Sequence, residues 1–167
     1  MILVKKEEDY FNNIFEIIKD SDEKICYVTF NKTPDFILES AENENISKDR
    51  FYFLDGITAR IKISSKCKNS IQISDFDNLA NISKNIKKIV DLGYPLVIFD
   101  SLSNLLIYSS LNDSLIAKTL RELFEEINKS NGKVLFVCFE NDLGNYSLDE
   151  TRSLFNSFII LSSLLGF

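Results

Sequence analysis

Histidine is missing from all 167 residues of this sequence. Its absence removes every mechanism that depends on an imidazole: Ser-His-Asp and Cys-His nucleophiles, His-ligated zinc or iron, and histidine acid–base catalysis. Any enzyme built on this chain would have to work with carboxylates, lysine, tyrosine, serine or cysteine.

Glycine is also scarce, and its placement excludes a phosphate-binding loop. A nucleotide triphosphate is usually held by the motif G-x-x-x-x-G-K-[ST] at a helix amino end. Only Gly132 is followed by a lysine, and Val134 comes next, in a segment that reads as a strand. Between the first predicted strand and helix the chain reads Lys5-Lys6-Glu7-Glu8-Asp9, whose three carboxylates would repel a triphosphate.

Cysteine usage and charge indicate the setting. The chain has three cysteines and no C-x-x-C pair. Cys26 and Cys138 lie in apolar runs, so we expect buried free thiols. With no signal-peptide pattern at the start, we expect a cytoplasmic protein. The apolar run at 158–167 is too short to span a membrane and reads as a buried strand.

The charge balance argues against anionic partners. Nineteen basic and 25 acidic residues give a formal charge of −6. Nucleic acids and anionic membranes are therefore unfavourable partners.

Length and periodicity predict one α/β domain covering residues 1–167. Apolar residues at helical spacing alternate with short runs rich in β-branched and aromatic residues. We expect a three-layer α/β sandwich with a mainly parallel central sheet, because Leu96–Phe99 and 133–139 are apolar throughout, as strands covered on both faces are. The predicted strands are 2–4, 24–30, 51–54, 96–99, 133–139 and one near the C-terminus; the predicted helices are 9–20, 33–43, 74–93, 113–130 and 148–155.

Several helix ends carry specific signals. Thr33 and Pro34 predict a helix start, with Thr33 as the N-cap and Pro34 in the first turn. The helix that follows should bury Phe36, Ile37 and Ala41. Gly93 should end the helix before it, as a residue of left-handed conformation often does.

Polar residues follow the predicted strands at their carboxyl ends, where open parallel sheets bind ligands. They are Asn31-Lys32, Asp55, Asp100-Ser101 and Glu140-Asn141-Asp142. The run Leu96 to Ser101, four apolar residues followed by Asp-Ser, has the pattern of a Walker B segment, in which the carboxylate holds Mg²⁺. Strands of α/β proteins often end in Asp, so a purely structural Asp100 is the other interpretation.

Three segments together resemble the RecA-like ATPases of the KaiC branch, over about residues 1–162. They are Tyr27–Ile37 with the helix after it, Val97–Ser103, and the helix 113–130 with its Asn131-Gly132 stop and the strand 133–139. The resemblance implies a P-loop NTPase, RecA-like core, here lacking the P-loop.

The departures from that family imply lost catalysis. The resemblance places Asn31-Lys32 where KaiC-like ATPases carry a pair of glutamates, one of which activates the attacking water. An amide and an ammonium cannot serve as that base. Of the parts that phosphoryl transfer requires, only the aspartate matched by Asp100 is left. We therefore expect a non-catalytic pseudo-ATPase domain acting in protein interaction or regulation, with no cofactor and with a protein partner or self-association.

Asp100 itself has two possible roles in such a domain. It is either a vestigial metal ligand or a cap for the turn into 102–108.

Two other functions compete with this one. An unconventional nucleotide-binding protein or ATPase could use Lys5, Lys6 and Lys32 in place of a P-loop. A receiver domain is disfavoured, because one strand–helix unit too many precedes Asp100.

The basic segment 57–74 stands apart from the rest of this acidic chain. It has no acidic residue and four basic residues, Arg60, Lys62, Lys66 and Lys68. We expect an exposed hairpin or edge strand, either guarding the sheet edge or docking an acidic partner.

Overall fold

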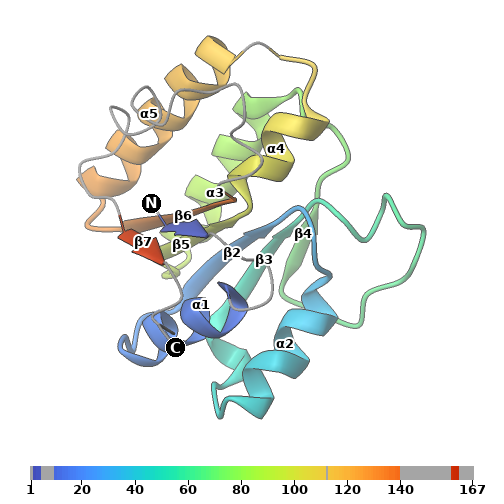
Figure 1. The fold of residues 1–167 in the computed structure, drawn as a ribbon, viewed down its shortest axis with the longest axis vertical. Helices are drawn as coiled ribbons and strands as arrows, with labels where there is room; N and C mark the ends of the chain where they lie inside the picture. Colours follow the sequence, from blue (N-terminus) through green and yellow to red (C-terminus); the bar gives the residue numbers. More distant parts are fainter. Residues whose placement is uncertain (1, 5–9, 112, 140–158, 162–167) are drawn as a thin grey trace, which may run out of the picture.

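Seven parallel strands form one sheet in the order β4-β3-β2-β5-β6-β1-β7 (Figure 1). The structure is a computed structural model that describes residues 2–4, 10–111, 113–139 and 159–161. The strands are β1 (Ile2–Val4), β2 (Ile25–Thr29), β3 (Phe51–Asp55), β4 (Ser70–Gln72), β5 (Leu96–Asp100), β6 (Lys133–Phe139) and β7 (Ile159–Leu161). The chain thus has the predicted parallel α/β fold.

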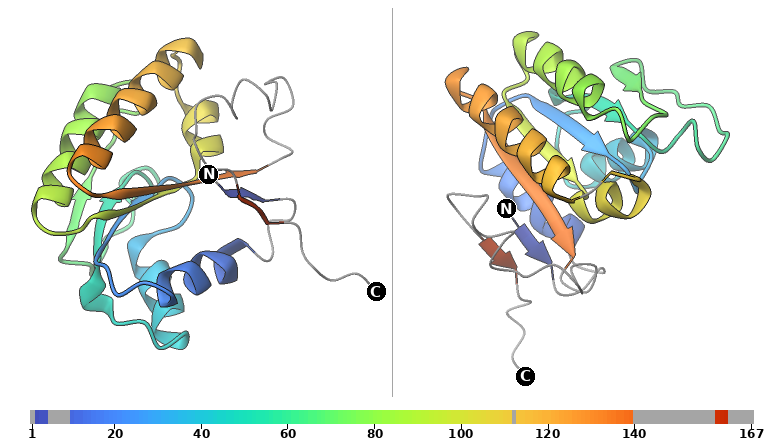
Figure 2. Two further views of the ribbon diagram at one scale, coloured as in Figure 1. Left: turned by 90° about the vertical axis from the view of Figure 1, so that its left-hand side faces the viewer. Right: turned by 90° about the horizontal axis from the view of Figure 1, so that it is seen from above.

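Helices cover both faces of this sheet. On one face lie α1 (Tyr10–Lys19) and α2 (Pro34–Asn43); on the other lie α3 (Leu79–Asp91), α4 (Leu102–Tyr108) and α5 (Asp113–Lys129) (Figures 1 and 2). A single 3-10 turn, Lys48–Arg50, precedes β3. All five residues of β2 and of β5 are buried, because each strand has neighbours in the sheet and helices above and below. The predicted three-layer sandwich is confirmed.

Alternation along the strands divides the apolar residues between two cores. Cys26 and Val97 belong to the core beneath α3 and α5. Ile25 and Ile98 belong to the core beneath α1 and α2. Since side chains alternate along a strand, a wholly apolar strand contributes side chains to the cores on both faces of the sheet.

Most of the predictions made for the helix ends are confirmed. The Thr33 hydroxyl accepts a hydrogen bond from the backbone N–H of Phe36 at 3.3 Å. Gly93 follows α3 with a φ of +93°, a conformation that favours glycine. Phe36, predicted as buried, is 48% exposed, because the buried side of α2 is the one that carries Ile37 and Ala41.

The start of α3 is later than predicted. The helix begins at Leu79, with the Asn78 side chain accepting from the backbone N–H of Asn81 at 3.0 Å. Before it, Asp77 accepts hydrogen bonds from the Ser109 hydroxyl at 2.9 Å and from the backbone N–H of Ser110 at 2.7 Å. These contacts tie residues 74–78 to the chain after α4, in an irregular conformation.

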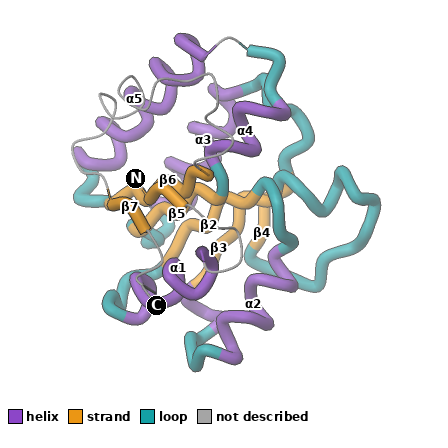
Figure 3. Tube along the Cα trace, viewed as in Figure 1, coloured by secondary structure: helices purple, strands orange, loops and turns teal. Residues whose placement is uncertain are grey.

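The basic segment forms a loop rather than a hairpin. The Asp55 carboxylate accepts the backbone N–H groups of Ile57 and Thr58, each at 3.0 Å, and thereby turns the chain away from the sheet. Figure 3 shows a long connection without regular structure between β3 and β4. The edge strand β4 comes only after the four basic residues.

The predictions about the C-terminal strand, the cysteines and the last helix can be compared with the structure only where it describes those residues. The C-terminal strand exists as β7, paired with β1. Cys26 is a buried free thiol, as predicted, whereas Cys67 is half-buried. The helix expected at 148–155 and the side chain of Cys138 lie outside the described residues. Within the described residues, no helix is both long and apolar enough to cross a membrane.

Candidate functional site

Three buried polar residues end the neighbouring strands β3, β2 and β5. Thr29 pairs in register with Asp55 on one side and with Asp100 on the other. Residues in register point to the same face of a parallel sheet, so all three side chains face the layer of α1 and α2. None of the three is exposed. This row lies at the carboxyl edge, where sheets of this type bind ligands.

The Asp100 carboxylate is enclosed by side chains of the protein itself. The Tyr27 hydroxyl donates to one oxygen at 2.8 Å, and the Asn31 amide nitrogen lies 3.4 Å from the other. The same amide donates to the Tyr10 hydroxyl at 3.0 Å. Both oxygens of Asp100 therefore already have donors.

Burial governs the protonation of this cluster. It raises the pKa of Asp100 to about 6, although the hydrogen bond from Tyr27, the charge of Lys32 and the hydrogen bonds from Asn31 and Tyr10 act to lower it. Burial also raises the pKa of Tyr27 well above its ordinary value, so this phenol stays protonated and can donate. The cluster can take up a proton at mildly acidic pH.

Lys32 is held over aromatic rings beside this cluster. Its ammonium lies 5.2 Å from the ring centre of Phe36, 5.8 Å from that of Phe11 and 6.0 Å from that of Tyr10. Such contacts attract a cation to the ring face. Thr29 fixes the turn, since its hydroxyl donates to the carbonyl of Lys32 at 2.5 Å and accepts from its N–H at 3.3 Å.

The structure brings only some of the predicted site residues together. Asn31 joins Asp100, while Asp55 caps the turn after its own strand. Lys5–Asp9 and Glu140–Asp142 lie outside the described residues. No three or more acidic or cysteine side chains in the described ranges are placed to hold a metal ion. Asp100 as a vestigial metal ligand remains a prediction.

The structural role predicted for Asp100 is wrong in its detail. The cap of α4 is Ser101, whose hydroxyl accepts from the backbone N–H of Asn104 at 3.2 Å. The carboxylate of Asp100 bonds to Tyr27 and Asn31 instead. The reason is that successive side chains point to opposite faces at the end of a strand.

Tyr27 and Tyr10 are members of the cluster that sequence reasoning missed. Tyr27 carries the one hydroxyl within the apolar run Ile25–Val28, and a buried hydroxyl needs a hydrogen-bond partner. That signal could have marked Tyr27. No comparable signal marks Tyr10, which reads as one more apolar position of α1.

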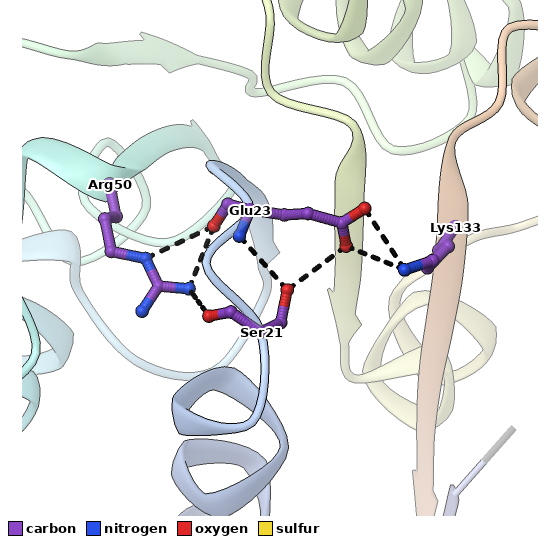
Figure 4. A network of polar contacts seen from close by, with 4 residues as sticks. All are labelled: Ser21, Glu23, Arg50 and Lys133. Carbon is purple, nitrogen blue, oxygen red and sulfur yellow. Dashed lines mark hydrogen bonds and ion pairs between the residues drawn. The ribbon is translucent and has the colours of Figure 1, made fainter.

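The opposite edge of the sheet has a polar network of another kind (Figure 4). The Arg50 guanidinium donates to the carbonyls of Ile18 at 3.0 Å and Glu23 at 2.9 Å, and also to that of Ser21. The Glu23 carboxylate accepts from the Ser21 hydroxyl at 3.2 Å and pairs with Lys133 at 3.1 Å. These contacts join the segments that enter β2, β3 and β6.

Comparison with known proteins shows the fold. No family model matches the sequence, and no curated protein matches it. Among solved structures, the chain is similar to a KaiC-like protein of the hyperthermophilic archaeon Pyrococcus horikoshii, with a TM-score of 0.63 at 12% identity over 95% of this chain and 68% of that one.

Two further solved structures are similar to this chain in fold. The flagellar accessory protein FlaH of Methanocaldococcus jannaschii gives a TM-score of 0.64 at 13% identity, over 95% of this chain and 68% of that one. The RadB recombinase gives 0.51 at 17% identity, over 83% of this chain and 60% of the RadB chain. The expected RecA-like core is confirmed as a fold.

Proposed function

Starting from this RecA-like, KaiC-like fold, we propose that the chain is a non-catalytic domain that acts by associating with proteins, in a regulatory role. The observation that supports this most is the enclosure of Asp100. The one carboxylate matched to a metal-binding position has both oxygens occupied by Tyr27 and Asn31.

A magnesium nucleotide does not fit the described residues around Asp100. Mg²⁺ requires oxygen ligands in near-octahedral geometry. The groups that touch Asp100 are hydrogen-bond donors, a phenol and an amide N–H, and the nearby charge is the ammonium of Lys32. A metal ion would have to displace the donors and lie close to a like charge.

The residues at the expected base position are engaged elsewhere. The Asn31 amide nitrogen donates to Tyr10 and Asp100, and the Lys32 ammonium lies over three rings. Neither group can take a proton from water at neutral pH. This arrangement supports a domain without hydrolytic activity.

A second candidate function is nucleotide binding by an unconventional route. It is favoured by Lys32, a partly exposed cation at the carboxyl edge of the sheet, where a phosphate could approach. In that case Lys32 would leave its aromatic contacts to meet the ligand.

Calorimetric titration with ATP and ADP in the presence of Mg²⁺, paired with thermal unfolding, tests the proposal. We expect no binding heat and no stabilisation at millimolar nucleotide. Micromolar binding would overturn the proposal. Loss of that nucleotide binding in Lys32→Ala would then identify the unconventional route. Loss of the binding in Asp100→Ala would instead identify a metal site. Asp91→Ala, at the exposed end of α3, is the matched control.

A further inference from the structure

The strand β4 ends the sheet on one side and bonds to β3 through alternate residues (Figure 1). The carbonyl of Asn69 accepts a hydrogen bond from β3 at 2.8 Å, and the backbone N–H of Ile73 donates one to β3 at 2.9 Å. Successive residues of a strand direct their backbone groups to alternate sides. The N–H and C=O groups of Ser70 and Gln72 therefore point away from β3, along the outer edge of the sheet.

These outward groups have no partner in the part of the chain that the structure describes. Outside the β3–β4 ladder, no hydrogen bond between described residues uses the backbone of Ser70 or Gln72. Gln72 is exposed and Ser70 is half-buried, so the edge is open. Natural sheets usually protect an open edge with a charge or a proline in the strand. The sequence of β4, Ser-Ile-Gln, has neither.

We propose that two copies of this chain pair through β4, antiparallel and related by a two-fold axis at Ile71, so that the two sheets join into one. In an antiparallel pair, opposite residues whose backbone groups face each other exchange two hydrogen bonds. With Ser70 of each copy opposite Gln72 of the other, every outward group of both strands is bonded. No other register achieves this within β4.

The charges on either side of β4 favour a second copy over another extended segment. Lys66 and Lys68 come just before the strand and Asp75 comes just after it, and all three side chains are exposed. No ion pair between described residues uses them. Because the paired strands run in opposite directions, the basic end of each copy lies beside the acidic end of the other. A segment of a single charge sign would be repelled at one end.

The centre of the pair is apolar. Ile71 is half-buried against the core beneath α3, and α3 itself packs mainly against β2, β3 and β5. In the two-fold pair the two Ile71 side chains lie opposite each other on the same face of the joined sheet, which removes their exposed surface from water. A strand of three residues makes a small contact, so we expect a weak dimer that forms as the concentration rises.

This inference gives the domain proposed above a partner and rests on that proposal for its purpose. Its test is separate, since oligomeric state is measured without nucleotide. A chain that dimerises through β4 but also binds ATP would overturn the proposed function and leave the dimer standing. A monomer that does not bind ATP would do the reverse.

The first experiment is sedimentation equilibrium of the full chain over a range of concentrations. We expect a species of twice the 19.2 kDa chain mass to accumulate. Gln72→Pro should weaken the dimer about tenfold or more, because proline lacks the N–H that donates across the pair. That N–H does not bond to β3, so the fold should persist, and circular dichroism checks it. The matched control Gln72→Thr keeps the N–H and should dimerise like the unchanged chain.

Charge reversal tests the choice of a second copy. Lys68→Glu and Asp75→Lys should each weaken the dimer severalfold, because each places like charges at both ends of the pair. Their equimolar mixture should restore a one-to-one complex, since both ends are then complementary. Lys84→Glu, an equal change of charge on the exposed side of α3, is the control and should dimerise like the unchanged chain.

Disulfide crosslinking tests the register. The Cα atoms of opposite residues in the position of Ile71 lie about 4.5 Å apart, within the reach of a disulfide. Oxidised glutathione should therefore crosslink Ile71→Cys into a covalent dimer. The control is Gln72→Cys, whose two thiols would lie diagonally, about 7–8 Å apart between Cα atoms, and should not crosslink. The unchanged chain measures the background from its own cysteines.

Four results would overturn the inference. They are a chain that is still monomeric at about 1 mM, a dimer that Gln72→Pro leaves unchanged, a mixture of the two charge-reversed variants that stays monomeric, and crosslinking of Gln72→Cys in place of Ile71→Cys.

Discussion

The two edges of the sheet use their polar groups in opposite ways. At the carboxyl edge, Asp100 bonds to other side chains, Tyr27 and Asn31, in a site that excludes solvent. At the amino edge, Arg50 bonds to backbone carbonyls, and its neighbour Glu23 pairs with the exposed Lys133 (Figure 4).

The difference shows which edge stabilises the fold and which one lowers its stability. A guanidinium is always charged and satisfies several carbonyls at once, so the amino edge stabilises the fold. A buried carboxylate without a bonded cation is stable mainly when protonated. The carboxyl edge thus holds a buried carboxylate whose hydrogen-bond donors all come from the protein itself.

Asp100→Asn should give the largest effect. The pKa of Asp100 is raised from 3.8 to about 6 in the folded chain. The folded state therefore binds this proton more tightly than the unfolded state does. The stability that the proton confers is complete below pH 4 and is lost as the pH rises to about 6, a loss of about 3 kcal/mol.

Asparagine cannot ionise, so the variant should lack this loss and should unfold at higher denaturant than the unchanged chain at pH 8. Its Oδ1 still accepts from Tyr27. A rotated Asn31 amide could offer the new side chain its Oδ1, which has no hydrogen-bond partner among the described residues. Urea unfolding between pH 4 and pH 8 measures both curves. A variant less stable than the unchanged chain at pH 8 would instead mean that Asp100 is paired with a cation.

Arg50→Lys should have the next largest effect, a loss of about 2 kcal/mol of unfolding free energy. Lysine keeps the charge but cannot donate to several carbonyls in one plane as the guanidinium does. Chemical denaturation at neutral pH measures the loss. Lys48→Arg, in the same 3-10 turn but exposed, is the control. An unchanged denaturation midpoint in Arg50→Lys would show that the network at the amino edge contributes charge alone.

Lys133→Ala should have the smallest effect, below about 1 kcal/mol. Its ammonium pairs with Glu23 at 3.1 Å, but its side chain is 68% exposed, and exposed pairs are weak and screened by salt. The small loss should vanish at high salt, as measured by urea unfolding. A loss as large as that of Arg50→Lys would contradict the division between the guanidinium and the exposed ion pair.

Much of the fold could be predicted from local signals. The apolar run at Leu96–Phe99 predicts a doubly covered strand, and Thr33-Pro34 predicts the start of α2; both are confirmed. The predicted burial of Phe36 and the predicted start of α3 were wrong. Both depend on contacts with residues that are distant in the sequence. Of the two alternatives predicted for the basic segment 57–74, the edge strand exists as β4, at Ser70–Gln72. The hairpin is wrong, because the Asp55 carboxylate turns the chain just after β3.

By itself the sequence determined the alternation of most strands and helices, the lack of any imidazole group in its 167 residues and the lack of the motif G-x-x-x-x-G-K-[ST]. These follow from composition and local spacing. Only the tertiary structure decided what surrounds Asp100. Its partners Tyr27 and Asn31 lie 73 and 69 residues away in the chain, and they meet it because the parallel register sets the end of β5 beside β2. Contacts of that range depend on how strands pair, which no local pattern specifies.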